Sequence, residues 1–198
     1  MSLIIFNFFW MTYNIFLSII PVILAFLYFK TDKKRILIRT FLCVLWLLFL
    51  PNSIYLFTDI VHLFQQLKIA SGLVALLLIL QYFVLEIYAV LTFILSTHPF
   101  EKELQKKVSI NSSTFIIIAL NFLVSFGVIL GNVKRLNSWD VLISPNYVVQ
   151  KSIDTLLSLN LMLVVILFGL FANFLYFLLR KKIADYINTY LVQVDVSM

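Results

Sequence analysis

The stretch "IASGLVALLLILQYFVLEIYAVLTFILS", Ile69–Ser96, decides the fold class of this chain. Glu86 is its single charged residue. The run is longer than the roughly 20 apolar residues that a helix needs to cross a bilayer. We therefore expect this stretch to form a membrane-spanning helix.

The composition extends this expectation to the whole chain. Hydrophobic residues make up 63% of the 198 residues and charged residues 12%, against about 45–50% and about 25% in soluble domains. With a mean hydropathy of +1.05, the chain has too little polar surface to cover a soluble core. We predict an all-α, polytopic bundle of five transmembrane helices, forming a single integral membrane domain over residues 1–198. The predicted spans are 2–29, 36–57, 69–96, 114–131 and 155–179.

The basic residues are distributed unevenly between the two ends of these spans. If the N-terminus lies outside, eleven of the fifteen Lys and Arg residues fall on the inner side, and the outer side holds only Lys68, Lys134, Arg135 and Lys151. Inner loops of membrane proteins are enriched in Lys and Arg. We therefore expect the N-terminus out and the C-terminus in, in a multi-pass protein of the cell membrane. The positive charge then faces lipid headgroups of the bilayer, and we expect no nucleic-acid partner.

In this topology a polar segment, "PNSIYLFTDIVHL", lies at the outer end of the second span. Asn52, Tyr55, Asp59 and His62 are separated by three, four and three residues, which places them on one stripe of a helix. Pro51 fits either the first turn of a new interfacial helix or a kink in the continuing span.

Two interpretations of the carboxylate and imidazole in this stripe remain open. Asp59 and His62 either form an acid–base pair, with Asp140 as a further catalytic group, or lie on the wet face of an interfacial helix. A divalent metal would need a third ligand, for which Asp140 is the candidate. The only cofactor that the sequence suggests is therefore a metal held by Asp59, His62 and Asp140.

A second polar segment, "NVKRLNSWDVLISPN", follows the fourth span and is also expected outside. Arg135 is suited to an anionic group such as a lipid phosphate, and Trp139 is typical of a membrane interface. The structural alternative is a loop pinned by an ion pair of Arg135 with Asp140 or Asp59. The candidate substrate-binding residues of the two segments are Asn52, Tyr55, Arg135, Asn137 and Trp139.

The two segments resemble a bacterial family of predicted membrane proteins, domain of unknown function 1361. The first family motif matches Trp46, Phe49, Leu50, Pro51, Asn52, Tyr55, Thr58, Asp59, His62 and Leu63. The second matches Gly127, Leu130, Gly131, Arg135, Asn137, Ser138, Trp139 and Asp140. The chain departs from the pattern at Ile129, where the family has tyrosine, and at Asn132, where it has arginine. The resemblance implies that the two segments belong together and implies no reaction.

Glu86 lies inside the third span, where an ionisable group is costly and often functional. It is either a neutral group hydrogen-bonded between helices or part of a proton or ion relay. By helical rise it lies about 25 Å inward from Ile69, so we expect it to be too deep to reach the outer segments.

Two classes of function follow from the sequence. In the first, an integral membrane enzyme binds or processes a lipid-linked or anionic headgroup substrate on its outer face. In the second, the chain is a non-catalytic accessory or assembly subunit with a membrane protein partner. The sequence therefore leaves open whether the protein is an enzyme.

Overall fold

The computed structural model describes the backbone of residues 2–195 and the side chains of residues 3–183 and of Asp185. The elements are α1 (Ser2–Lys30), α2 (Ile36–Phe49), α3 (Pro51–Tyr55), η1 (Leu56–Asp59), α4 (Ile60–Leu67), α5 (Gly72–Gln105), α6 (Ile110–Lys134), α7 (Asp140–Ile143), α8 (Pro145–Leu157) and α9 (Leu159–Asp195). Residues 2–195 contain no strand, so the described chain is all-helical, as predicted.

Five helical segments of the described chain are long and apolar enough to cross a membrane, which agrees with the predicted number. They are Leu3–Lys30, Ile36–Leu67, Gly72–Gln105, Ile110–Lys134 and Leu159–Ile183. Large apolar side chains stay exposed along these helices, Phe9 and Phe115 at 71% each among them. Such surfaces are consistent with contact to lipid tails.

The second membrane-length segment runs ten residues past the predicted boundary at Phe57 because the chain remains helical beyond Pro51. Leu50, Tyr55, Asp59 and Ile60 all keep right-handed helical backbone angles. Pro51 occupies the first turn of α3 and lacks the N–H that would continue the hydrogen-bond ladder of α2. The polar segment therefore continues the second membrane-length segment past the proline.

The boundaries of the fifth segment also differ from the prediction. Thr155 belongs to α8, and Ser158 adopts an extended backbone (φ −89°, ψ 106°) that separates α8 from α9. The long apolar helix therefore begins at Leu159.

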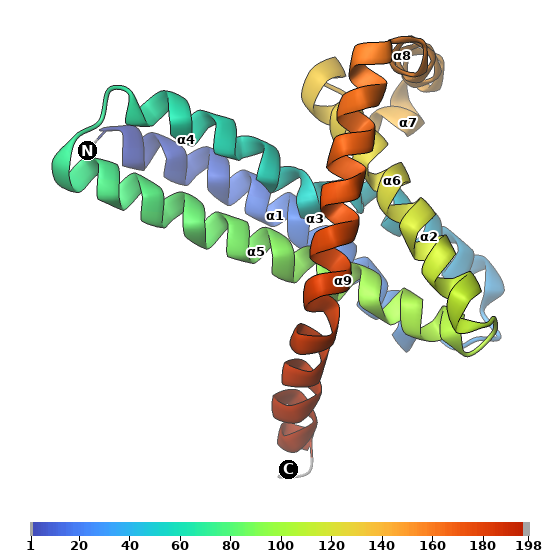
Figure 1. Cartoon of the computed structure of the whole chain (residues 1–198). Helices are drawn as coiled ribbons and strands as arrows, with labels where there is room; N and C mark the ends of the chain where they lie inside the picture. Colours follow the sequence, from blue (N-terminus) through green and yellow to red (C-terminus); the bar gives the residue numbers. More distant parts are fainter. Residues whose placement is uncertain (1, 196–198) are drawn as a thin grey trace.

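The helices form two groups that meet at α3. In Figure 1, α5 lies beside α1 and α4 on the left, whereas α9 crosses α5 and packs along α6. The short helix α3 contacts α1, α5 and α6. This position makes α3 the junction between the two groups of helices.

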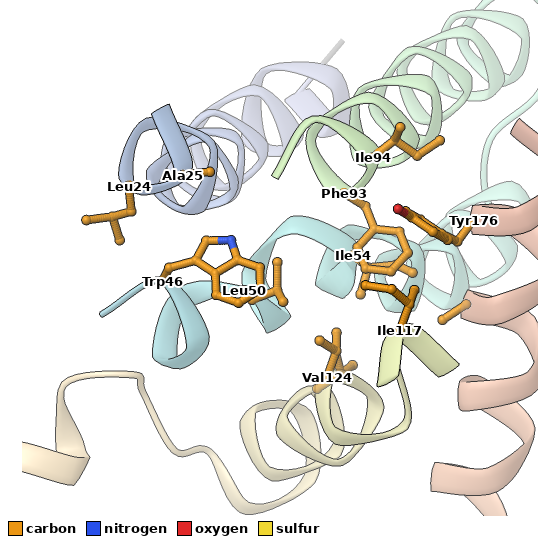
Figure 2. Close-up of a cluster of buried hydrophobic side chains, with 12 residues drawn as sticks. Leu24, Ala25, Trp46, Leu50, Ile54, Phe93, Ile94, Ile117, Val124 and Tyr176 are labelled. Atoms are coloured by element: carbon orange, nitrogen blue, oxygen red, sulfur yellow. The ribbon is translucent and has the colours of Figure 1, made fainter. Parts of the chain in front are cut away.

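The main apolar core surrounds this junction. Trp46, Leu50 and Ile54 recur every four residues and are fully buried on one side of the α2–α3 segment. Figure 2 shows them between Ala25 of α1 and the side chains of α5, α6 and α9. The Trp46 indole Nε1 donates a hydrogen bond to the Ser96 carbonyl of α5 across 3.0 Å.

A buried ion pair joins α5 to α9 near the basic ends of the bundle. Glu101 is 1% exposed and pairs with Arg180. The same carboxylate accepts hydrogen bonds from the Tyr176 hydroxyl at 2.7 Å and from Gln105 Nε2 at 3.1 Å. The sequence analysis did not predict this cluster.

Candidate functional site

A cavity of about 440 Å³ lies where α3 meets α6. Its lining comes from α1, α2, α3, α6 and the segment after α6. Its polar lining residues are Tyr13, Asn14, Asn52, Tyr55, Arg135, Asn137, Ser138 and Trp139. Its apolar lining includes Leu17, Leu47, Leu48, Leu123, Phe126 and Leu130. All five residues that the sequence proposed for substrate binding therefore line a single cavity.

The segment after α6 turns sharply over the cavity. Arg135 ends α6 in the left-handed conformation (φ 59°, ψ 32°), which glycine or asparagine usually occupies at this position. The Leu136 N–H donates to the Leu130 carbonyl across 3.3 Å, which closes the end of the helix. The Arg135 side chain is thus projected from a rigid backbone turn.

Asp140 stabilises the next turn rather than lining the cavity. Its Oδ2 accepts a hydrogen bond from the Asn137 backbone N–H at 2.7 Å and a longer one from the Asn137 side-chain amide at 3.4 Å. These bonds close a turn over residues 137–140. Asp140 does not line the cavity, so its position gives no support to the predicted catalytic role.

One direct hydrogen bond connects the two polar segments. Asn52 Nδ2 donates to the Ser138 hydroxyl oxygen across 3.0 Å. The backbones also approach closely here, since a Cβ added to Gly127 would lie 2.5 Å from Pro51 Cγ. The segments that the sequence placed together on one face are therefore in contact.

Arg135 carries the positive charge at the cavity. Its side chain is exposed, and no carboxylate among the described residues lies within ion-pair distance of it. The alternative in which Arg135 pairs with Asp140 or Asp59 is therefore wrong for the described residues. The guanidinium remains available to an anion from outside the protein.

Asp59 is buried and does not line the cavity. It is 5% exposed, and its Oδ2 accepts a hydrogen bond from Asn14 Nδ2 at 3.1 Å. His62 is exposed on α4 with its ring 6.0 Å from the ring of Trp10. No hydrogen bond joins Asp59 to His62 within the described chain, and neither residue lines the cavity.

The structure does not assemble the metal ligands considered in the sequence. Within the described residues, no group of three His, Cys, Asp or Glu side chains is arranged to hold a metal ion. Asp59 is buried and bonded to α1, whereas Asp140 is bonded within its own loop and His62 is exposed on α4. The proposed metal ligands are therefore not brought together.

The first helix contributes polar residues that the sequence analysis missed. Asn7, Trp10 and Asn14 recur at helical spacing along one face of α1. Asn7 exchanges two hydrogen bonds of 2.8 Å with Gln66 of α4, and Asn14 reaches both Asp59 and the cavity. Polar residues at intervals of three and four in an otherwise apolar span are the signal that could have identified this face.

Glu86 lies on α5, which packs against η1 and α4 of the first polar segment. Both of its carboxyl oxygens are buried, and they have no hydrogen-bond partner among the described residues. Asp59 lies within the second membrane-length segment. The separation of Glu86 from the polar segments stays a prediction.

Comparison with known proteins identifies the family. The family model described as "Protein of unknown function (DUF1361)" matches residues 13–175. The chain belongs to this family. No curated protein and no solved structure matches it. The DUF1361 match covers every residue that lines the cavity, from Tyr13 to Val148, so the cavity is built entirely within the region that the family shares.

Proposed function

We propose that this DUF1361 protein binds the anionic headgroup of a lipid or lipid-linked molecule in the cavity at α3 and α6. One observation carries the proposal: the exposed guanidinium of Arg135, which has no ion-pair partner among the described residues, stands at a cavity that is also lined by apolar side chains. Arg offers a fork of donors that matches phosphate and carboxylate oxygens. An amphiphile with an anionic head and an apolar tail fits this combination of linings.

The size and polarity of the cavity support such a ligand. A volume of about 440 Å³ lies within the range of about 300–1,000 Å³ typical of small-molecule sites. Asn52, Asn137 and Ser138 supply neutral hydrogen-bonding groups beside Arg135. Leu17, Leu123 and Phe126 supply apolar contacts for the remainder of the ligand.

The proposal is one of binding rather than bond cleavage. The titratable side chains that line the cavity in the described chain are Tyr13, Tyr55 and Arg135. None of these is a carboxylate or an imidazole, the usual general acids and bases. Asp59 and His62 do not line the cavity.

The test is a comparison of thermal stability in detergent with and without added lipid. We expect phosphatidylglycerol to raise the Tm of the parent, and phosphatidylcholine to leave it unchanged. Ligand binding stabilises a protein by about 2.7 kcal/mol at a hundredfold excess over Kd. Inorganic phosphate is the third probe, because it separates recognition of a lipid from recognition of a free anion.

The matched variants are Arg135→Gln and Lys134→Gln, which remove neighbouring positive charges. Only Arg135 lines the cavity. We expect Arg135→Gln to weaken lipid binding about tenfold or more, and Lys134→Gln to retain it. Equal losses in both variants would indicate general attraction of lipid to basic residues and would contradict the proposed site.

We further propose that the cavity opens on the outer side of the cell membrane, with the N-terminus out and the C-terminus in. The support is the asymmetry of basic residues. Lys33 and Lys151 lie on opposite sides in this topology. With Cys43→Ser as background, a membrane-impermeant maleimide added to intact cells is expected to label Lys151→Cys and not Lys33→Cys. Labelling of Lys33→Cys and not of Lys151→Cys would show that the topology is the opposite of the proposed one.

An accessory role is the second candidate. The hydrogen bond between Asn52 and Ser138 and the close approach of Gly127 to Pro51 hold the two polar segments together. If no anionic lipid changes the Tm while Asn52→Ala and Gly127→Ala abolish folding, the motifs serve assembly of the bundle and this second candidate is favoured.

A further inference from the structure

Helix α8, which lies between the cavity and the last membrane-length helix, has three faces of different character. One face packs against the bundle, where α8 contacts α6 and α9. It carries Val148, Ser152 and Thr155 at intervals of four and three residues, and Thr155 is fully buried. Val148 on this face also lines the cavity. The other two faces of α8 are exposed and differ in polarity.

The first exposed face of α8 is apolar. It consists of Val149, Ile153 and Leu156, which are 57%, 49% and 56% exposed. Their spacing of four and three residues places them on one stripe of the helix. A contiguous apolar surface that a protein leaves open marks a place where a membrane or another protein covers it.

The second exposed face of α8 is polar. Asn146, Gln150 and Asp154 recur every four residues on it. The Asp154 carboxylate pairs with Lys151 across 3.6 Å, and the Lys151 ammonium lies 5.3 Å from the centre of the Tyr147 ring. α8 is therefore an amphipathic helix. A charged face beside an apolar one is typical of helices that lie in the plane of a membrane interface.

The position of α8 in the fold indicates that lipid is what covers the apolar face. Ser158 alone separates α8 from α9, whose segment Leu159–Ile183 is long and apolar enough to cross a membrane. Figure 1 shows α8 almost end-on where α9 begins, so α8 lies across the end of α9 rather than continuing it. Exposed apolar side chains continue from α8 into α9 through Leu156, Leu157 and Leu159. The surface that faces lipid tails along α9 therefore extends onto α8.

We propose that α8 is a membrane-anchoring helix that lies in the lipid–water interface, with Val149, Ile153 and Leu156 against the acyl chains and the polar face toward headgroups and water. Interfacial helices bury their apolar face about 5–10 Å into the boundary between headgroups and acyl chains. Because Val148 of the same helix lines the cavity, this anchoring holds one wall of the cavity near the depth of the lipid headgroups. The proposal is independent of what the cavity binds and of which side of the membrane α8 occupies.

The test measures how often nitroxide spin labels on α8 collide with two paramagnetic reagents, in liposomes that contain the full-length chain. Oxygen concentrates among the acyl chains, whereas a nickel chelate, supplied on both sides of the membrane, stays in water. With Cys43→Ser as background, single labels are attached through Val149→Cys and Ile153→Cys on the apolar face, and through Asn146→Cys and Gln150→Cys on the polar face. All four positions are exposed, so the labels displace no packed side chain.

We expect the two labels on the apolar face to collide several-fold more often with oxygen, relative to the nickel chelate, than the two labels on the polar face. Free access of the chelate to all four labels would show that α8 stands in water. Preference for oxygen at all four would place the whole helix among the acyl chains. Shielding of the apolar-face labels from both reagents would show that protein, such as a second copy of this chain, covers the stripe. Each of these three results overturns the proposal.

Leu167 on α9 supplies the reference for contact with lipid tails. It is exposed within the membrane-length segment Leu159–Ile183, so a label attached through Leu167→Cys gives the reading of the bilayer interior. The labels on the apolar face of α8 should approach this reading, and those on the polar face should not. Each labelled variant must also elute in detergent at the volume of the parent, which shows that the label reports on the folded chain.

Discussion

Asn52 donates a hydrogen bond of 3.0 Å to the hydroxyl oxygen of Ser138, although 86 positions separate the two residues in the chain. The bond joins α3, in the middle of the second membrane-length segment, to the turn that follows α6. Both residues line the cavity beside Arg135.

This bond predicts coupling between Asn52→Ala and Ser138→Ala. Each variant removes one side of the bond, so the double variant should be less destabilised than the sum of the two. A net hydrogen bond is worth about 0.5–1.5 kcal/mol, and we expect a coupling energy of that size. Unfolding of the single and double variants in detergent measures it. Ser144→Ala, which has no bond to Asn52, should combine additively.

Arg135→Gly separates stability from ligand binding. Arg135 has a φ of 59°, and a left-handed backbone costs an L-residue about 1–2 kcal/mol relative to glycine. We therefore expect the variant to be as stable as the parent or more so, and to lose its response to phosphatidylglycerol. Arg135→Lys keeps the strain and the charge, and should retain part of the response. A large drop in Tm for Arg135→Gly would show that the guanidinium has a structural role.

Gly127→Ala is expected to destabilise the protein by about 1–3 kcal/mol, the usual cost of overpacking. Its new Cβ would lie 2.5 Å from Cγ of the rigid Pro51 ring. Gly131→Ala is the control, since the nearest atom to its Cβ, the Leu136 carbonyl oxygen, lies 3.5 Å away. That variant should be neutral or stabilising, because alanine favours a helix over glycine. Matching effects in the two variants would contradict the close packing of α3 against α6.

Arg180→Met should cost about 3–5 kcal/mol, because it leaves Glu101 buried without its cation. Replacing both partners, in Arg180→Met with Glu101→Leu, should recover much of this loss. Lys106→Met removes an exposed partner of Glu103 and is expected to cost less than about 1 kcal/mol. Denaturation midpoints of the four proteins give the comparison. A double variant less stable than Arg180→Met alone would sink this explanation.

The membrane-length helices could be predicted because long apolar runs have few stable alternatives in a bilayer. The course of residues 58–67 could not. A polar stripe such as that of Asp59 and His62 fits a wet interfacial face and an inward face equally well. Only the packing of η1 and α4 against α5 decides between them.

The cavity-lining residues Asn52, Tyr55, Arg135, Asn137 and Trp139 could be proposed from two motifs and a common side of the membrane. The partners contributed by other helices could not. Whether Asn14 meets Asp59, or Glu101 meets Arg180, depends on which faces of two helices touch and how far one is shifted along the other. Those quantities are set by packing of the whole bundle and leave no local pattern in the sequence.

The side chain of Asn14 belongs to the cavity wall and also holds Asp59. A ligand that reorients the Asn14 amide changes the environment of the Asp59 carboxylate. Protonation of Asp59 in turn changes the hydrogen bond that orients Asn14 at the cavity wall. Thermodynamic linkage requires the two effects to be equal in free energy. The affinity of the cavity for an anionic lipid should therefore vary with pH in the parent and lose that variation in Asn14→Leu. The fraction of protein with lipid bound would then depend on the pH around it.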